Sequence, residues 1–262
     1  MVKQLIQKLA GVAGYEVFRR GATTAVSRRA ETVAELEALY RQFVFRELTP
    51  RPGREERIAR LIGTSAGEAL HIVEYLRRSL KVEGDVCELG VAQGATSALL
   101  ASELLDGAKA LWLFDSFEGL SRPTREDVLI NDVFNLGSMD RYEGQMAFGR
   151  AEVTRRVREV GFPDARVNIV KGFIEETIRR PGLPRAVCFA YVDFDFYTPI
   201  QVALDWLDGV VPAGGHVIVD DYGWFSAGAQ QAVDEFVARR GAAWRHLPSL
   251  EGAGHFAVLA RV

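Results

Sequence analysis

FAYVDFDFYTP, residues 189–199, is an apolar run that ends in two carboxylates. The run has the length and composition of a buried β-strand, and Asp193 and Asp195 follow it directly. Carboxylates beside an apolar core are costly unless a cation, a hydrogen-bond network or water compensates them. The end of this strand is therefore a candidate functional position.

A second apolar run with the same kind of ending follows one helix and one turn later. HVIVDDYG, residues 216–223, ends in Asp220 and Asp221, and the connection has the length of a right-handed crossover between parallel strands. Strands joined in this way place their carboxyl ends at the same edge of a sheet, where ligands bind in such folds. We therefore expect up to four carboxylates at one edge, with Asp193 and Asp195 on the same side of an extended chain.

Short apolar runs alternate with helical patterns on both sides of these two strands. Such alternation predicts an α/β fold, in which a mostly parallel sheet carries helices on both faces. The last two runs are expected to form a hairpin, which predicts an antiparallel edge at the C-terminal end of the sheet. Seven strands are expected, at residues 85–91, 110–117, 166–172, 186–195, 216–223, 244–249 and 254–262.

Two parts of the chain lie outside this alternation. Residues 1–80 have a helical apolar period and predict a helical extension of the main domain, residues 81–262. Its first segment is amphipathic and is expected to pack on the body of the protein or on a second subunit of a homodimer or larger homo-oligomer; its apolar residues are Leu5, Leu9 and Val12. Residues 121–150 are long, mixed and weakly periodic, which is typical of lids and binding loops. We expect them to form a substrate-facing insertion.

The composition is that of an ordinary globular protein, with 48% hydrophobic and 26% charged residues. A formal net charge of −3 supplies no electrostatic reason to expect a nucleic acid as partner. Cys87 and Cys188 lie within strand-like runs and are expected to be buried thiols, which fits a reducing compartment such as the cytoplasm. The first 20 residues show no sustained apolar stretch and no convincing cleavage site, so neither a signal peptide nor a membrane span is expected.

CELGVAQGATS, residues 87–97, reads as a strand, a glycine turn and the start of a helix. Gly90 and Gly94 permit a tight turn that a ligand can approach closely, and backbone N–H groups at the helix start can meet polar ligand atoms. The G-x-x-x-G spacing has Ala92 in place of a glycine and so differs from the dinucleotide fingerprint. A turn that serves only the fold is an equal alternative for this motif taken by itself.

The next strand ends in Asp115, and an acid at this position commonly bonds a ribose hydroxyl in nucleotide-binding sheets. Asp115 could instead cap the following turn through Ser116, but the preceding glycine turn favours the ribose role. Further along, Phe173 and Glu175 lie where the base of a cofactor could be sandwiched. Glu175 and Glu176 are also typical of the first turn of a helix, where the helix dipole favours acids.

Four carboxylates at one edge would repel one another and raise some of their pKa values, unless a cation lies among them. No His or Cys accompanies these four aspartates, so soft metals are poorly served. Ligands that are all oxygen favour Mg²⁺, with Mn²⁺ or Ca²⁺ as alternatives. The acids could also cap helices and turns, but two acidic strand ends in one crossover unit favour the metal site.

Taken together, these motifs resemble the macrocin, mycinamicin and novobiocin family of sugar O-methyltransferases, which use S-adenosylmethionine and Mg²⁺. The pattern D-x-D-x-Y followed by P-x-G-G-x-x-x-x-D-D-Y is specific, whereas the glycine motif is common to class I methyltransferases. The matching stretches occur in order over roughly residues 84–240, as DVCELGVAQGATS, FDSFEGL, KGFIEET, YVDFDFYTPIQVAL and PAGGHVIVDDYG.

The resemblance implies a Rossmann-like class I methyltransferase fold and roles for individual residues. Asp193, Asp220 and Asp221 fall on metal ligands, and Asp195 falls on the acid proposed as general base. Together with the motifs above, the resemblance predicts that S-adenosylmethionine is contacted by Glu88, Gly90, Gly94, Thr96, Asp115, Ser116, Phe173, Glu175 and Asp193.

The implied activity is methylation of a hydroxyl on a sugar, a glycosylated natural product or a polysaccharide precursor. Two departures bear on this small-molecule acceptor: Phe194 replaces a glycine often found between the two aspartates, and residues 127–149 differ from the macrolide-sugar enzymes. Phe134, Met139 and Tyr142 of the insertion are expected to line the acceptor pocket. The alternatives are a methyltransferase for a catechol-like or other non-sugar hydroxyl, and a non-catalytic cofactor-binding or scaffold protein.

Overall fold

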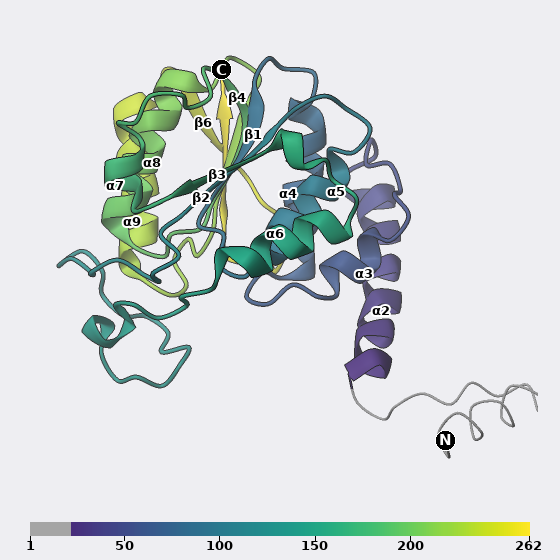
Figure 1. Ribbon diagram of the computed structural model, residues 1–262, viewed down its shortest axis with the longest axis horizontal. Coiled ribbons are helices and arrows are strands. Elements are labelled where there is room, and N and C mark those ends of the chain that lie inside the picture. Colours follow the sequence, from purple (N-terminus) through teal and green to yellow (C-terminus); the bar gives the residue numbers. More distant parts are fainter. Residues whose placement is uncertain (1–21) are drawn as a thin grey trace, which may run out of the picture.

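A seven-stranded sheet forms the centre of the computed structural model, which describes residues 22–262 (Figure 1). The strand order is β3-β2-β1-β4-β5-β7-β6. Each apolar run expected to be a strand forms one, and the bounds are β1 (Asp85–Leu89), β2 (Leu111–Asp115), β3 (Val167–Lys171), β4 (Val187–Val192), β5 (His216–Val219), β6 (Trp244–Leu247) and β7 (Ala257–Arg261). The α/β fold predicted from the alternating pattern is therefore confirmed.

The C-terminal hairpin is also confirmed, and it enters the sheet by its second strand. β7 pairs antiparallel with β5 on one side and with β6 on the other, whereas all other neighbours in the sheet are parallel. The register places Val219 beside Ala257 and Leu247 beside Val258. Because β7 has a neighbour on each side, its Val258 and Leu259 are fully buried.

Helices cover both faces of the sheet. In Figure 1, α4, α5 and α6 lie on one side and α7, α8 and α9 on the other, with α2 and α3 outside α4 and α5. The bounds are α2 (Ala22–Phe43), α3 (Arg54–Ile58), α4 (Ala66–Ser79), α5 (Ala95–Glu103), α6 (Arg150–Glu159), α7 (Ile174–Thr177), α8 (Tyr197–Val210) and α9 (Ala227–Arg240), with 3₁₀ turns η1 (Met139–Tyr142) and η2 (Asp164–Arg166).

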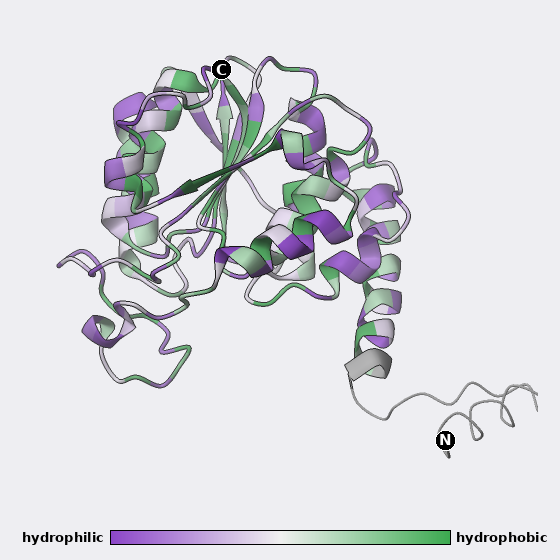
Figure 2. Cartoon of the chain, viewed as in Figure 1, coloured by the Kyte–Doolittle hydropathy of each residue, from purple (hydrophilic) through white to green (hydrophobic). Residues whose placement is uncertain are grey.

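The core has two halves because successive strand residues point to opposite faces of the sheet. Val86 and Leu113 pack with the helices α2 to α6, while Cys87 and Leu89 pack with α7, α8 and α9. Figure 2 shows the apolar residues concentrated on the strands and on the helix faces turned toward them. The sheet is therefore buried on both faces, and its strand ends are where polar side chains can gather.

The N-terminal helices share a hydrophobic cluster with the sheet. α4 begins at its N-cap Ser65, whose side chain accepts a hydrogen bond from the N–H of Glu68 (3.0 Å). Arg54 of α3 is fully buried and pairs with Glu37 (2.6 Å) and Glu103 (2.8 Å), which ties α3 to α2 and α5. The amphipathic segment expected near the start of the chain lies outside the described residues. No helix from residue 22 onward is long and apolar enough to span a bilayer.

The predicted insertion lies between β2 and α6 and extends away from the sheet beneath α7 and α9 in Figure 1. It has a small core of its own, in which Met139 and Tyr142 pack with Phe196 and Phe225. A single β-bridge joins Leu129 to Ser226. The insertion is thus anchored on the segments that directly follow the acidic ends of β4 and β5.

Candidate active site

The carboxyl ends of β1 and β4 meet where the strand order changes direction, because β2 flanks β1 on one side and β4 flanks it on the other. Open α/β sheets bind ligands in the crevice at such a switch point. A cavity of about 490 Å³ opens there, a volume typical of small-molecule sites. The turn after β1, the ends of β2, β4 and β5, the start of α7 and the insertion all contribute to its lining.

The turn after β1 adopts the backbone conformation that its glycines permit. The φ angles are +90° at Gly90 and +79° at Gly94, and Ala92 between them has φ +44°. Gly90 and Ala92 line the cavity, whereas Gly94 is not among its lining residues. A Cβ on Gly94 would lie 2.9 Å from the Cα of Val153, so Gly94 permits close packing of the turn against α6.

Asp115 ends β2 and holds this turn. Its Oδ2 accepts hydrogen bonds from the backbone N–H groups of Val91 (2.8 Å) and Ala92 (3.0 Å), and its Oδ1 accepts one from Phe117 (2.6 Å). Asp115 therefore does cap a turn, and it also lines the cavity together with Ser116. Because each carboxylate oxygen has two lone pairs, capacity to accept from a ribose hydroxyl remains.

Glu88 and Thr96 lie behind the turn. The Glu88 side chain is buried and accepts hydrogen bonds from the hydroxyl and the backbone N–H of Ser97, at the start of α5. Burial raises the pKa of Glu88 well above its usual range, and the bonds from Ser97 oppose that shift. Glu88, Gly94 and Thr96 are not among the residues that line the cavity. Glu88 holds the start of α5 and Gly94 belongs to the turn itself. Direct contact between any of these three residues and a cofactor stays a prediction.

Phe173 and Glu175 follow β3 and line the cavity as expected. The Oε2 atom of Glu175 is the one buried side-chain nitrogen or oxygen within residues 22–262 that lacks a hydrogen-bond partner. Leaving such an atom unpaired costs about 1–3 kcal/mol, and a donor on a bound ligand would remove the cost. The exocyclic amino group of adenine is such a donor, so Glu175 fits the base of S-adenosylmethionine.

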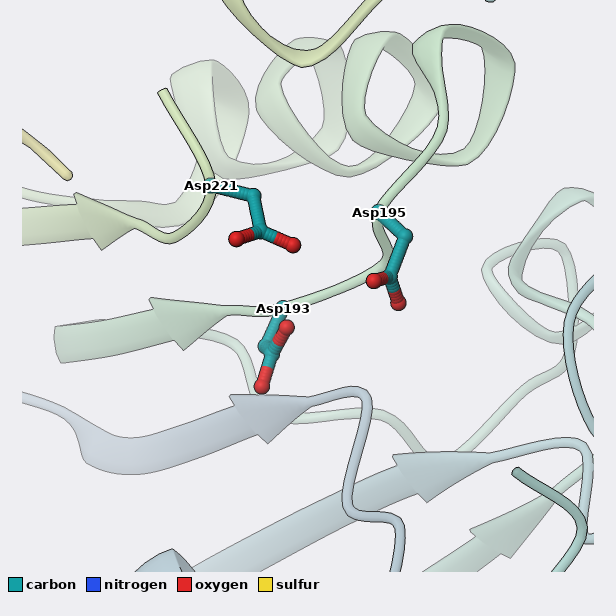
Figure 3. Close-up of side chains that lie close together, drawn as sticks. All are labelled: Asp193, Asp195 and Asp221. Carbon is teal, nitrogen blue, oxygen red and sulfur yellow. The ribbon is translucent and has the colours of Figure 1, made fainter. Parts of the chain in front are cut away.

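Three carboxylates converge at the ends of β4 and β5 (Figure 3). Asp193, Asp195 and Asp221 each offer an oxygen within 4.8 Å of the other two. The φ angles are +63° at Asp195 and +57° at Asp221, a conformation that is uncommon for residues other than glycine and that concentrates at functional sites. β4 ends at Val192, so strand alternation does not explain the convergence; Asp195 reaches the cluster from a left-handed turn.

The fourth expected acid, Asp220, lines the same cavity but has other partners. The hydroxyl of Tyr191 donates to its Oδ2 (2.5 Å), and the N–H of Asp221 donates to its Oδ1 (2.7 Å). The same hydroxyl lies 3.3 Å from Oε1 of Glu68, a buried residue of α4. Glu68 is an acid of this site that the sequence did not reveal, because a Glu three residues after Ser65 reads as an ordinary capping box.

Burial and mutual repulsion favour the protonated forms of these acids. Burial, followed by the charges of neighbouring acids, raises the pKa of Asp193 and of Glu68 well above the usual range. The pKa of Asp221 is raised to about 10, mainly by burial and then by Asp220. The pKa of Asp195 is raised to about 7, again mainly by burial. A divalent cation would replace these protons and remove the repulsion.

The donor set fits a hard divalent cation. The potential ligand group within the described residues consists of aspartates only, and oxygen ligands suit Mg²⁺, Mn²⁺ or Ca²⁺. Cys87 and Cys188 are free thiols buried in β1 and β4, as expected, and stand outside the site. Asp193 and Asp221 belong both to the observed group and to the ligand set implied by the resemblance.

Apolar side chains from three parts of the chain complete the cavity; they include Ile62, Val133, Phe134, Phe148, Trp224 and Phe225. Of the three insertion residues expected there, Phe134 lines the cavity, whereas Met139 and Tyr142 are buried in the core of the insertion. The ring of Tyr142 stacks on that of Phe134, with centroids 5.7 Å apart. Tyr142 thus supports the wall that Phe134 forms.

The strand order, the glycine turn at the switch point and the acidic ends of β4 and β5 are together those of the class I methyltransferase fold. Residues 61–247, more than half of the chain, match the family model described as macrocin O-methyltransferase (TylF). The chain belongs to this family. The family suggested by the sequence motifs is therefore confirmed.

Three curated relatives are named as O-methyltransferases. The chain is 27% identical over 179 residues (67% of this chain, 66% of the relative) to the 8-demethyl-8-(2,3-dimethoxy-α-L-rhamnosyl)-tetracenomycin-C 4′-O-methyltransferase of Streptomyces olivaceus. It is 30% identical over 164 residues (60% and 60%) to the demethyldecarbamoylnovobiocin O-methyltransferase of Streptomyces niveus. It is 28% identical over 176 residues (65% and 66%) to the mycinamicin III 3″-O-methyltransferase of Micromonospora griseorubida. The chain thus spans somewhat less than two thirds of the length of these relatives.

Solved structures share the fold. The O-methyltransferase NovP superposes with a TM-score of 0.65 at 21% identity, covering 90% of this chain and 99% of that chain. CalS11, a calicheamicin methyltransferase, superposes with a TM-score of 0.56 at 19% identity, covering 93% and 95%. At these identities the likeness concerns the fold, and it confirms the class I methyltransferase architecture.

Proposed function

We propose that this protein is an S-adenosylmethionine- and Mg²⁺-dependent O-methyltransferase that acts on a hydroxyl of a sugar-containing small molecule. The observation that carries the proposal is the cluster of Asp193, Asp195 and Asp221 beside the glycine turn at the switch point, in a chain of the macrocin O-methyltransferase family. The acid cluster and the proposed cofactor pocket thus share one cavity. Methyl transfer requires this, because the acceptor oxygen must be aligned with the methyl donor.

The cofactor assignment is supported by the charge and hydrogen bonding of the cavity. Its titratable lining residues, among those described, are all acidic: Asp115, Glu175, Asp193, Asp195, Asp220 and Asp221. S-adenosylmethionine carries positive charge on its sulfonium and amino groups, which such a lining favours. Asp115 would accept from the ribose, and the unpaired oxygen of Glu175 from the adenine amino group. When bound, the cofactor supplies an activated methyl group.

For the metal we propose Asp193, Asp220 and Asp221 as ligands and Asp195 as the group that accepts the proton of the acceptor hydroxyl. A bound Mg²⁺ lowers the pKa of a hydroxyl that coordinates it. Asp195 lies within reach of this group but outside the three proposed ligands, so its carboxylate would be free to accept that proton. Asp220 would have to turn from Tyr191 toward its neighbours, since its carboxylate now accepts from that hydroxyl.

The acceptor class rests on the relatives and on the lining of the cavity. The named relatives methylate a tetracenomycin rhamnoside, a novobiocin precursor and mycinamicin III. The apolar walls of the cavity and the lack of Lys, Arg or His among its described lining residues support an uncharged acceptor with an apolar part. A phosphorylated acceptor would find no side-chain cation there to pair with.

The test combines calorimetry with an acceptor screen. Titration of the purified protein with S-adenosylmethionine should give one binding site per chain, and labelled S-adenosylmethionine should transfer its methyl group to deoxysugar conjugates in the presence of Mg²⁺ but not of EDTA. Catechols serve as the non-sugar arm of the screen. No binding of S-adenosylmethionine would refute the assignment, and transfer to catechols alone would replace the sugar acceptor.

Single substitutions of the four aspartates can distinguish metal ligands from the proton acceptor when Mg²⁺ binding and turnover are both measured. Asp195→Asn should keep Mg²⁺ binding and lose turnover, because a proton acceptor is removed but the ligands remain. Asp220→Asn should lose Mg²⁺ binding. If instead Asp195→Asn loses the metal and Asp220→Asn keeps it, the ligand set is the closely spaced group of Asp193, Asp195 and Asp221.

A further inference from the structure

Trp224 is placed differently from the other tryptophans and from its own neighbours. It is the exposed one of the four tryptophans, at 40% exposure. Tyr222 and Phe225, on either side of it, pack into hydrophobic clusters, whereas Trp224 belongs to none of those found in the described chain. It nevertheless lines the cavity that holds the acid cluster. A large aromatic ring that is exposed and lines the same cavity as the acid cluster offers a contact surface for a ligand.

The indole is held firmly although it is exposed. Its ring stacks on that of His255, with centroids 4.3 Å apart and an interplanar angle of 19°. The backbone N–H of Trp224 donates to the carbonyl of Asp221 (3.1 Å), and its carbonyl accepts from the side-chain amide of Asn131 (2.7 Å). The backbone of His255 is fixed in turn, because its carbonyl accepts from the N–H of Tyr222 (2.8 Å). One face of the indole is thus backed by His255, and the other is left for a ligand.

We propose that Trp224 is the platform on which the sugar ring of the acceptor stacks, and that it selects the hydroxyl presented to the acid cluster. The proposal rests on the proposed function and assigns the sugar subsite within it. A pyranose ring has an apolar face of C–H groups and a rim of hydroxyls, so it packs flat on an aromatic ring while its hydroxyls stay free. An uncharged pyranoside is the ligand class that a neutral, flat and rigid surface fits.

The backbone holds Trp224 in a fixed position relative to Asp221 of the acid cluster. Only Tyr222 and Gly223 separate Trp224 from Asp221, and the hydrogen bond between the two backbones closes that turn. Asn131 joins the insertion to the same turn. A ring stacked on Trp224 is therefore held at a fixed offset from Asp221, and the offset decides which hydroxyl approaches the cluster.

Binding can be measured without turnover because Trp224 is the exposed tryptophan. Phenyl α-L-rhamnopyranoside and phenyl β-D-glucopyranoside are added to protein loaded with Mg²⁺ and S-adenosylhomocysteine, which has no methyl group to transfer, and acrylamide quenching of the intrinsic fluorescence is recorded. We expect at least one glycoside to protect the fluorescence, and 2-phenoxyethanol, which has the aryl group but no sugar ring, to give no protection. Trp224→Leu should abolish the protection. Trp206→Phe is the matched control, because Trp206 packs on Phe114 away from the cavity and its loss should leave the protection intact.

The test is completed by steady-state kinetics with an acceptor that the screen has shown to be a substrate. Trp224→Leu should raise the KM for the acceptor roughly three- to tenfold, the range expected for loss of one stacking contact, while Trp224→Phe restores part of it and S-adenosylmethionine affinity is unchanged. Protection by neither glycoside, or an unchanged KM in Trp224→Leu, overturns the platform. If the glycosides bind through Trp224 and no methyl group is transferred, the platform stands and the proposed activity fails.

Discussion

The backbones of Gly90 and Asp193 are so close that a Cβ on Gly90 would stand 1.8 Å from the carbonyl oxygen of Asp193. Gly90 follows β1 and Asp193 follows the adjacent strand β4, and the N–H of Asp193 donates to the carbonyl of Leu89 (2.7 Å). The turn proposed to hold the cofactor and the first proposed metal ligand therefore touch through their main chains. No side chain at position 90 is compatible with this contact.

Gly90→Ala should consequently displace Asp193 and cost the fold about 3 kcal/mol or more, the sum of left-handed strain and overpacking. Gly182→Ala is the matched control: its φ of +86° is similar, but a Cβ there meets nothing within 4 Å. It should cost only the strain, about 1–2 kcal/mol. Chemical denaturation of both variants measures the difference, and equal losses would show that the contact with Asp193 is not the cause.

The stability of the metal-free protein should fall as the pH rises from 7 to 9. In the folded chain the pKa values of Asp195 (about 7) and Asp221 (about 10) lie above the ordinary 3.8, so the folded state holds more protons than the unfolded state. The free energy of unfolding then decreases with pH until the folded pKa is passed, by up to about 1.4 kcal/mol per pH unit for each extra proton. Denaturation in EDTA at pH 7, 8 and 9 measures the slope.

Mg²⁺ should reverse this trend, because binding to carboxylates displaces protons and becomes easier as the pH rises. The stabilisation by Mg²⁺ is therefore expected to be larger at pH 9 than at pH 7. Asp221→Asn removes one titrating group and should flatten the slope in EDTA. A variant slope identical to that of the parent protein would mean that other groups govern the pH dependence.

The site residues that could be predicted from the sequence are those that belong to a local pattern of consecutive residues. Asp193 and Asp220 could be placed at one sheet edge because each directly follows an apolar run and one crossover separates the runs. Glu68 could not, since it reaches the cluster from the buried face of α4 and no local pattern distinguishes it from a helix cap. Trp224 was missed for a related reason: one aromatic residue in a loop does not indicate whether it packs inward or faces a cavity.

The sequence also did not distinguish the roles of the two glycines in the turn after β1. Gly90 and Gly94 look alike in the sequence, but one makes room for Asp193 and the other for α6. Asp115 was weighed as either a turn cap or a cofactor ligand, and its position at the cavity with three backbone donors shows that the first role leaves room for the second. The roles of Gly90, Gly94 and Asp115 depend on packing partners that are distant in the chain. Patterns within a single sequence do not reveal such partners.

The unpaired Oε2 of Glu175 should make this residue specific to the cofactor. Glu175→Gln removes the charged acceptor, and we expect S-adenosylmethionine affinity to fall about tenfold or more, as for loss of a hydrogen bond to a charged group. Mg²⁺ binding should be unchanged because Glu175 lies outside the aspartate group. Glu176→Gln is the neighbouring control, since Glu176 is exposed. Calorimetry compares them, and similar affinities for both variants would argue against a contact with the adenine.

The insertion is fastened to the start of α8 by one buried carboxylate, Asp127. Its Oδ1 accepts from the N–H of Tyr197 (2.8 Å) and the hydroxyl of Ser226 (3.0 Å), and its Oδ2 accepts from the N–H of Thr124 (2.8 Å). The N-cap residue of α8 provides no side-chain cap, so Asp127 supplies it from 70 residues away. Because Tyr197 lies two residues after Asp195, this bond also restrains the proposed proton acceptor.

Asp127→Ala should therefore lower turnover at saturating acceptor at least tenfold as well as destabilise the fold by about 2 kcal/mol through loss of the cap. Asp132→Ala is the matched control, because Asp132 accepts a similar set of bonds from Leu136, Gly137 and Tyr142, all within the insertion. It should destabilise the insertion and leave turnover largely intact when assayed well below the melting temperature. Asp127→Asn keeps an acceptor oxygen for Tyr197 and should recover part of the activity, whereas equal turnover in Asp127→Ala and Asp132→Ala would separate the insertion from the placement of Asp195.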